Sequence, residues 1–318
     1  MAVNCRMPPN TQCSLSAPIT TPTRLHDKLV IMDHLSFFER YPIVSANQSG
    51  LSVFYDELPL WSSSFVPELL ERAPISQNAT IVDLGCGTGF LSIEIAQRCG
   101  PNSKVFAIDP WPIANERLRA KLDFIGIENV EVIQKNGIDT GLDAASVDLI
   151  VSNLGINNFE EPDRVLRECH RIAKPGACLQ MTTNLVGNMK EFYAELNELL
   201  RDRNREDLVE RVSKHVAHRG TSESVEQLID QAGFRIVHSS ANNFQMHFSD
   251  GSALFGHWFI RLAFLPDWMS LFPTADIEWI FSSLEDRLNT RAKESGRFSV
   301  TIPVAYFEAL RNSDPHLP

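Results

Sequence analysis

Short apolar runs alternate with longer helical patterns in the middle of the chain, beginning at Ala79. The runs are rich in Val and Ile, as buried strands are, and each segment between them is long enough for a crossover helix. Parallel strands require such crossovers, so the pattern predicts an α/β fold with a parallel sheet. The expected strands are 80–84, 104–108, 130–133, 147–152 and 178–183, and the expected helices are 90–99, 113–124 and 162–173.

The second part of the chain has a different pattern. In order, it contains a long polar helical pattern (189–218), a helix (222–232), a strand (234–248), an aromatic-rich apolar segment (253–272) and a helix (278–295). The strand is expected to bend near Asn242 and Asn243. A later alternating strand is expected around Val300 to Val304, where Pro303 argues against a fully paired central position because proline has no N–H to donate.

Composition narrows the class of protein. A chain of 318 residues that is 43% hydrophobic can bury one large core with extensions. Its net charge of -11 argues against nucleic acid as a partner. The six cysteines lack the short paired spacing of a metal site or a disulfide framework. This cysteine spacing predicts no metal site. No apolar run approaches the roughly 20 residues needed to cross a bilayer, which predicts a cytoplasmic protein with no membrane partner.

The first 26 residues contain no Asp or Glu and many Ser, Thr and Pro. This composition is typical of either a disordered tail or an organelle transit peptide. Four prolines oppose the amphipathic helix that a mitochondrial presequence needs, so a disordered tail over residues 1–27 is the favoured interpretation. The prolines are Pro8, Pro9, Pro18 and Pro22.

A glycine-rich segment, Asp83 to Gly89, joins the first expected strand to the first expected helix. Its glycines allow close backbone approach to a ligand, and the helix N-terminus offers free N–H groups to a carboxylate. A dinucleotide fingerprint would need a third glycine where Phe90 stands, and a pyrophosphate would tolerate Asp83 poorly. The segment therefore favours S-adenosylmethionine. Asp109, at the end of the second strand, can accept hydrogen bonds from both ribose hydroxyls of either ligand.

These residues resemble the first motif of the class I S-adenosylmethionine-dependent methyltransferases. The resemblance extends from about Tyr55 to the C-terminus, and the segments 55–61, 153–159 and 250–253 look like those of a bacterial small-molecule subgroup. It implies a Rossmann-like methyltransferase fold, with a doubly wound, mostly parallel seven-stranded sheet and helical lid insertions. It also implies S-adenosylmethionine as the cofactor.

The same resemblance implies which residues hold the cofactor. Asp109 would hold the ribose, Pro110 and Trp111 would flank the adenine, and Asn153 and Leu154 would face the methionine end and the substrate. Asn136 stands where the family usually has Asp, which weakens the expected contact with the adenine amine. The full expected set is Asp83, Gly85, Cys86, Gly87, Gly89, Asp109, Pro110, Trp111, Asn136, Gly137, Asn153 and Leu154.

Pattern and resemblance together divide the chain into parts. These are a disordered tail (1–27), an N-terminal helical lid (28–78), a cofactor-binding α/β core (79–250) with a helical insertion over the substrate site (185–220), and a C-terminal helical extension with the last strand (251–318). The residues expected to contact substrate are Tyr55, Trp61, Asn157, Asn158, Phe192 and Trp258. No catalytic side chain is indicated, because transfer from a sulfonium depends mainly on alignment and exclusion of water.

The predicted function is methyl transfer from S-adenosylmethionine to a small-molecule acceptor. Two alternatives remain open at this point. One is a non-catalytic cofactor-binding or scaffold module of the same fold, and the other is a nicotinamide-dependent oxidoreductase, which Phe90 disfavours. The sequence leaves the acceptor atom and the oligomeric state open, a homodimer included.

Overall fold

The structure is a computed structural model, and it describes residues 35–44, 60–217 and 219–312. The expected disordered tail (1–27), part of the expected N-terminal lid and the candidate substrate residue Tyr55 lie outside these ranges. No helix within the described ranges is both long and apolar enough to cross a bilayer.

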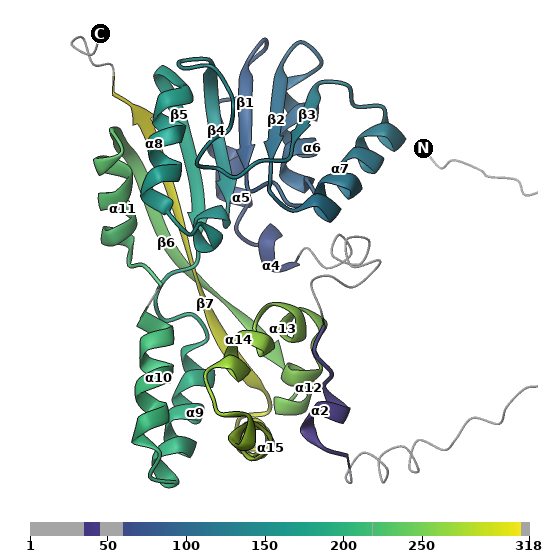
Figure 1. Ribbon diagram of the computed structural model, residues 1–318, viewed down its shortest axis with the longest axis vertical. Coiled ribbons are helices and arrows are strands. Elements are labelled where there is room, and N and C mark those ends of the chain that lie inside the picture. Colours follow the sequence, from purple (N-terminus) through teal and green to yellow (C-terminus); the bar gives the residue numbers. More distant parts are fainter. Residues whose placement is uncertain (1–34, 45–59, 218, 313–318) are drawn as a thin grey trace, which may run out of the picture.

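Seven strands form one sheet in the order β3-β2-β1-β4-β5-β7-β6 (Figure 1). Strands β1 to β5 are parallel to one another, whereas β7 is antiparallel to both β5 and β6. The order turns back at β1 and β4, which confirms the predicted doubly wound, mostly parallel sheet. The strands are β1 (Thr80–Leu84), β2 (Lys104–Ile108), β3 (Val130–Ile133), β4 (Val147–Asn153), β5 (Ala173–Thr183), β6 (Phe234–Phe248) and β7 (Phe298–Arg311).

Helices cover both faces of this sheet. Neighbouring residues of β1 point to opposite sides: Ile81 packs with Ile95 of α6, whereas Val82 packs with Val165 of α8, and all of these side chains are almost completely buried. This is why the apolar runs are continuous, since both faces of a parallel strand must be covered. The helices are α5 (Pro67–Arg72), α6 (Phe90–Cys99), α7 (Pro112–Ile125), α8 (Pro162–Ile172) and α11 (Ser222–Gln231).

Strands β6 and β7 continue together beyond the rest of the sheet. Strand β5 pairs with β7 only as far as Thr183 opposite Ala305, whereas β6 pairs with β7 along its whole length. Pro303 lies in the extended part of β7, where β6 is the paired strand and Asn243 is its partner. The missing N–H of Pro303 therefore costs no hydrogen bond to β5. The pairing of β6 with β7 is uninterrupted at Asn242 and Asn243, where a bend was expected, and the register shift falls between Ile236 and His238.

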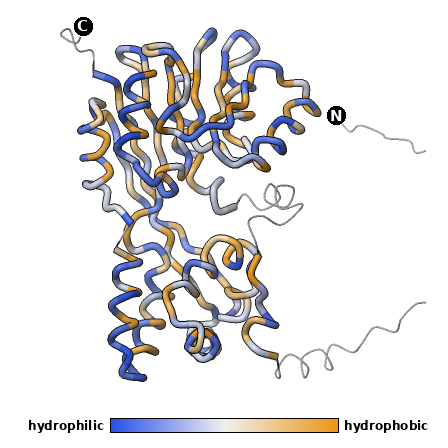
Figure 2. The backbone as a smooth tube through the Cα atoms, in the orientation of Figure 1, coloured by the Kyte–Doolittle hydropathy of each residue, from blue (hydrophilic) through white to orange (hydrophobic). Residues whose placement is uncertain are grey.

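A second lobe of helices packs around this two-stranded extension (Figure 1). Its core is rich in aromatic side chains, whereas the outward turns of α10 are mostly hydrophilic (Figure 2). The helices are α2 (Phe37–Arg40), α9 (Lys190–Asp202), α10 (Glu206–Ala217), α12 (Gly251–Gly256), α13 (Trp258–Ala263), α14 (Leu265–Ser270) and α15 (Thr274–Ser295).

Several expected helical boundaries differ from those observed. The pattern over 189–218 is two helices rather than one, because the chain turns at Asn204, whose φ of +55° lies in the left-handed region that Asn tolerates. The aromatic-rich segment 253–272 forms three short helices, and α15 begins at Thr274 rather than at Glu278.

The segment that contains α2 is held on α15 by two carboxylates. Glu278 accepts a hydrogen bond from the backbone N–H of Phe37 (2.7 Å). Glu285, which is 2% exposed, accepts hydrogen bonds from Arg40 (2.8 Å) and from the Tyr41 hydroxyl (2.6 Å). Burial and the bond to Glu285 raise the pKa of Tyr41 to about 12, so its hydroxyl remains a donor. Residues 35–44 therefore belong to the helical lobe.

We expect Phe192→Ala to lower the free energy of unfolding by about 3–5 kcal/mol, as removal of a buried aromatic ring does. Phe192 is fully buried and stacks on Trp268, with ring centroids 4.0 Å apart. Urea unfolding followed by circular dichroism measures the effect. Phe124→Ala is the matched control, because that ring is 91% exposed and its loss should change stability by no more than about 0.5 kcal/mol. Equal effects of the two substitutions would contradict the packing described.

Candidate functional site

The loop after β1 is shaped by glycines with positive φ. Gly85, Gly87 and Gly89 have φ of +75°, +53° and +81°, a region that other residues rarely adopt. A Cβ on Gly89 would come within 2.2 Å of Leu118, whereas one on Gly87 would meet nothing within 4 Å. Gly89 is thus required for packing on α7, while Gly87 leaves open space beside the backbone.

Asp109 connects this loop to the end of β2. One carboxylate oxygen accepts a hydrogen bond from the N–H of Gly87 and the other from the N–H of Trp111, both at 2.8 Å. Burial raises the pKa of Asp109, and these two bonds oppose that effect. Each carboxylate oxygen has a second lone pair, so the group can also accept from a pair of ligand hydroxyls.

Asp83 lies beneath the loop rather than on its surface. Its side chain is 1% exposed, and one oxygen accepts a 2.5 Å hydrogen bond from the Ser92 hydroxyl on α6. Burial is the main reason why the pKa of Asp83 rises to about 7, and the nearby charge of Asp109 raises it further. An acid at this position can either order the loop or meet the amino group of a methionine moiety, and ordering the loop is the role that has a contact in the structure.

Cys86 points away from the open side of the loop. Its side chain is 7% exposed and packs in a cluster with Ala107 and Leu118. Burial, together with the nearby carboxylates, raises the pKa of the Cys86 thiol well above its usual value. The thiol is therefore a core group, and only the backbone of Cys86 is available to a ligand.

The residues expected around the adenine lie beyond β2 and β3. Pro110 is exposed and Trp111 is half-buried, whereas Gly137 is buried against Val165. The side chain of Asn136 is exposed, and its oxygen accepts a 3.3 Å hydrogen bond from a backbone N–H within its own turn. These positions border the same edge of the sheet as Asp109.

Asn153, the last residue of β4, links three segments. Its amide donates to the carbonyl of Ser62 in α4 (Leu60–Ser63) at 3.0 Å, and its oxygen accepts from the Thr182 hydroxyl at 2.6 Å. Leu154 follows with a φ of +62° and begins the short 3-10 helix η1 (Gly155–Asn158). Asn153 therefore holds α4 at the carboxyl ends of β4 and β5.

The expected substrate residues divide into two groups. Asn157 and Asn158 are exposed on η1, and Asn157 accepts a 2.5 Å hydrogen bond from the Thr183 hydroxyl at the end of β5. The other three described residues are aromatic. Trp61 is 9% exposed among the rings of Phe65, Phe244, Phe259 and Phe264, Trp258 is half-buried at the start of α13, and Phe192 lies inside the core of the helical lobe. The structure therefore does not place Phe192 next to the other candidates.

Three polar residues near the site were not indicated by the sequence pattern. They are Ser92, Thr182 and Asn115, whose amide donates to the Asp109 carbonyl at 2.8 Å while the side chain is 0% exposed. Ser92 carries the one signal that could have been used, since it is a hydroxyl in the first turn of an otherwise apolar helix face next to Leu91 and Ile95.

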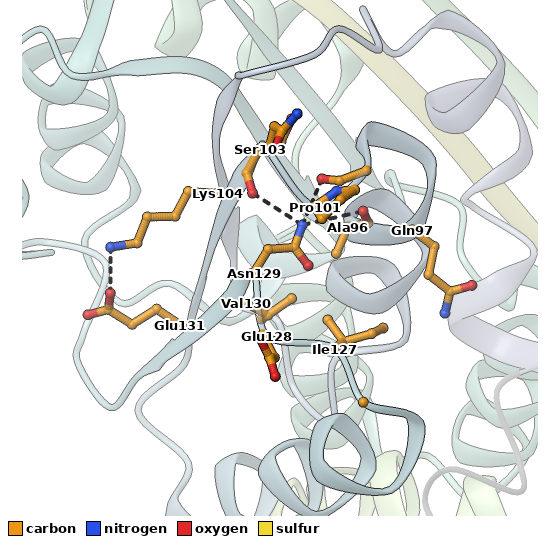
Figure 3. A pocket seen from close by; sticks show the side chains of 13 residues that line it. Ala96, Gln97, Pro101, Ser103, Lys104, Ile127, Glu128, Asn129, Val130 and Glu131 are labelled. Carbon is orange, nitrogen blue, oxygen red and sulfur yellow. Dashed lines mark hydrogen bonds and ion pairs between the residues drawn. The ribbon is translucent and has the colours of Figure 1, made fainter.

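A hollow of about 920 Å³ lies at the opposite edge of the sheet (Figure 3). It is bordered by Lys104 and Val130, which begin β2 and β3, and by the loop that follows α6. Asn129 fills part of its wall and donates to the carbonyls of Gly100 (3.0 Å) and Ser103 (3.2 Å). Ligands of open α/β sheets bind at the carboxyl ends of the strands, so this hollow is not the candidate cofactor site.

A family model described as a methyltransferase domain matches residues 75–233, which is half of the 318-residue chain. A demethylmenaquinone methyltransferase from Geobacillus stearothermophilus is 25% identical over 133 residues, covering 40% of this chain and 55% of that protein. The corresponding enzyme from Lactococcus lactis is 27% identical over 124 residues, covering 39% and 48%. The chain thus spans about half the length of these curated relatives.

Solved structures support the fold. A protein of Bacillus halodurans C-125 assigned to the methyltransferases has a TM-score of 0.52 at 17% identity, covering 79% of this chain and all (100%) of that one. The YcgJ protein of Bacillus subtilis has a TM-score of 0.50 at 14% identity, with the same coverage of 79% and 100%. These likenesses show the fold, and the family match over half of the chain, together with the loop that ends at Gly89, identifies the chain as a member of the methyltransferase-domain family, in the class I S-adenosylmethionine-dependent group.

Proposed function

We propose that this protein transfers a methyl group from S-adenosylmethionine to a small-molecule acceptor bound between the sheet and the helical lobe. The observation that carries the proposal is the pairing of Gly87 with Asp109, which sets an open glycine loop beside a carboxylate at the carboxyl edge of the sheet. That arrangement fits adenosine, because a nucleoside needs both close backbone approach and a paired acceptor for its ribose.

Individual residues have distinct parts in this proposal. Asp109 accepts from the ribose hydroxyls, and the open side of Gly87 accommodates the ligand next to the backbone. Pro110 and Trp111 flank the adenine, while Asn136 and Gly137 border it from the end of β3. Gly85, Gly89 and the buried Asp83 and Cys86 shape the loop, and Asn153 and Leu154 border the methionine end. Bound S-adenosylmethionine supplies an electrophilic methyl group.

The helical lobe is proposed to cover the acceptor. Helix α9 follows directly from β5, so this lobe lies beside the carboxyl edge of the sheet (Figure 1). Asn153 and the aromatic rings around Trp61 join α4 to both lobes. Such cover excludes water and aligns the acceptor, which are the main demands of transfer from a sulfonium. The proposed cover is formed jointly by segments from the predicted N-terminal lid, the 185–220 insertion and the C-terminal extension.

The curated relatives support a small acceptor as a class. Their name gives demethylmenaquinone as the molecule on which they act. Since the match covers only 40% of this chain, the helical lobe of this protein is free to select a different molecule. A nicotinamide-dependent reaction has less support, because Phe90 begins α6 where a dinucleotide site has glycine.

Asp109→Ala should weaken the binding of S-adenosylhomocysteine at least tenfold, because two charge-assisted hydrogen bonds are lost at about 1.5–3 kcal/mol each. Isothermal titration calorimetry measures the dissociation constant directly. Asp123→Ala, an exposed carboxylate on α7, is the matched control and should bind as the unchanged protein does. Failure of the unchanged protein to bind S-adenosylhomocysteine would refute the proposed function, and an unaltered constant for Asp109→Ala would refute the ribose role.

Binding of S-adenosylhomocysteine should also depend on pH through Asp83. Its pKa of about 7 leaves roughly half of the groups protonated at neutral pH. The ligand ammonium favours the ionised form, so binding should release a proton and become up to roughly tenfold tighter between pH 6 and pH 8. Calorimetry in two buffers of different ionisation enthalpy measures the release. Asp83→Asn should remove both the proton release and the change of affinity with pH. The same pH dependence in this variant would show that Asp83 is not its source.

A further inference from the structure

A cluster of polar side chains lies beyond the end of β5, where the two lobes meet. It consists of Asn184, Asn188, Tyr193, Arg219 and Trp268, which we call the waist cluster. Arg219 donates to the side-chain oxygen of Asn184 (3.2 Å) and also contacts the Tyr193 hydroxyl. Trp268 donates to that hydroxyl at 2.9 Å. The carbonyl of Gly220 accepts from Val186 at 3.0 Å, which fixes the backbone beside Arg219 on the turn that carries both asparagines.

Arg219 brings a positive charge into this cluster. Its side chain is half-buried, and burial lowers the pKa of the guanidinium, which nevertheless stays protonated at neutral pH. Within the described part of the chain no carboxylate forms an ion pair with it, and the exposed Asp267 contributes only a longer-range attraction. Removing a charge from water without pairing it is costly, so the position favours an anionic ligand.

Hydrogen-bond donors exceed acceptors in the waist cluster. The Tyr193 oxygen already receives the indole N–H of Trp268, and among the described residues nothing accepts the proton of this hydroxyl. The side chain of Asn188 is 1% exposed, and neither its nitrogen nor its oxygen has a hydrogen-bond partner in the described ranges. Buried polar groups in folded proteins are normally paired, so Asn188, four residues after Asn184 on the same turn, is a second polar group that a polar ligand would satisfy.

The waist cluster adjoins the edge at which the methyl group would be presented. Asn184 directly follows Thr183, whose hydroxyl donates to Asn157 on η1. Thr182, one position earlier, donates to Asn153 at the end of β4. The chain that holds Arg219 is therefore continuous with the residues proposed to border the methionine end of the cofactor.

We propose that the waist cluster is a subsite for a carboxylate group of the acceptor, with Arg219 as its principal partner. This inference rests on the proposed methyltransferase function and names the chemical class of its acceptor. The planar fork of a guanidinium matches a carboxylate in two parallel hydrogen bonds, and the Tyr193 hydroxyl and the Asn188 amide supply further donors. The net charge of -11 repels anions in general, so selection of an anion depends on this local positive group.

The test uses the full chain saturated with S-adenosylhomocysteine. Acetate, succinate, benzoate and 4-hydroxybenzoate are titrated by isothermal calorimetry, and benzamide and inorganic phosphate serve as neutral and phosphate probes. We expect at least one carboxylate to bind saturably, benzamide not to bind, and phosphate to bind more weakly than the best carboxylate. Arg219→Gln should weaken carboxylate binding at least tenfold while leaving the affinity for S-adenosylhomocysteine unchanged.

Arg201→Gln is the matched control, because it removes one exposed positive charge from α9 of the same lobe and should leave carboxylate binding unchanged. Arg219→Lys covers the case in which Arg219→Gln does not fold: it keeps the charge, loses the fork and should bind the carboxylate several-fold more weakly. The proposal is overturned if no carboxylate binds, if benzamide or phosphate binds equally well, or if the Arg219 variants bind as the unchanged protein does. Absence of S-adenosylhomocysteine binding is a separate result, which refutes the proposed function itself.

Discussion

The antiparallel ladder between β6 and β7 is the interaction on which the two-lobed architecture depends. Its upper half completes the sheet next to β5, and its lower half is the surface around which the helical lobe packs. Ile302, on the lower half, is fully buried in the aromatic core, whereas Phe307 on the upper half is buried against the sheet helices. One continuous strand therefore carries both cores, and this fixes the helical lobe beside the carboxyl edge of the sheet.

The candidate cofactor site is built almost entirely from backbone geometry. Asp109 is the exception, because its carboxylate holds the Gly87 loop at one end and the start of α7, through Trp111, at the other. Such a site explains why no prominent catalytic side chain is present in the motif. The cofactor brings its own reactive group, so the protein has only to position it and exclude water.

The sequence pattern was most informative where a residue's role is local. Strands β1, β2 and β3 have the predicted bounds. The apolar runs of β1 and β2 are mostly buried, whereas β3 is a half-buried edge strand, and the glycine spacing that predicted the loop reflects a φ requirement at each position. Patterns were less informative where distant contacts decide the outcome. The expected substrate residue Phe192 stacks on Trp268, which is far away in sequence, and this makes it a core residue. The turn at Asn204 and the bond from Ser92 to Asp83 likewise depend on packing that periodicity does not encode.

The place of β7 between β5 and β6 also constrains the order in which the molecule can form. Cys178 of β5 pairs with Leu310, and Phe234 of β6 pairs with Arg311, so β6 has no place in the sheet until residues 298–311 have been synthesised. The parallel strands β1 to β5 have no such requirement and can assemble earlier. Pairings between residues so distant in sequence close slowly. During synthesis, the half of the molecule with the glycine loop is therefore able to fold ahead of the lobe proposed to choose the acceptor.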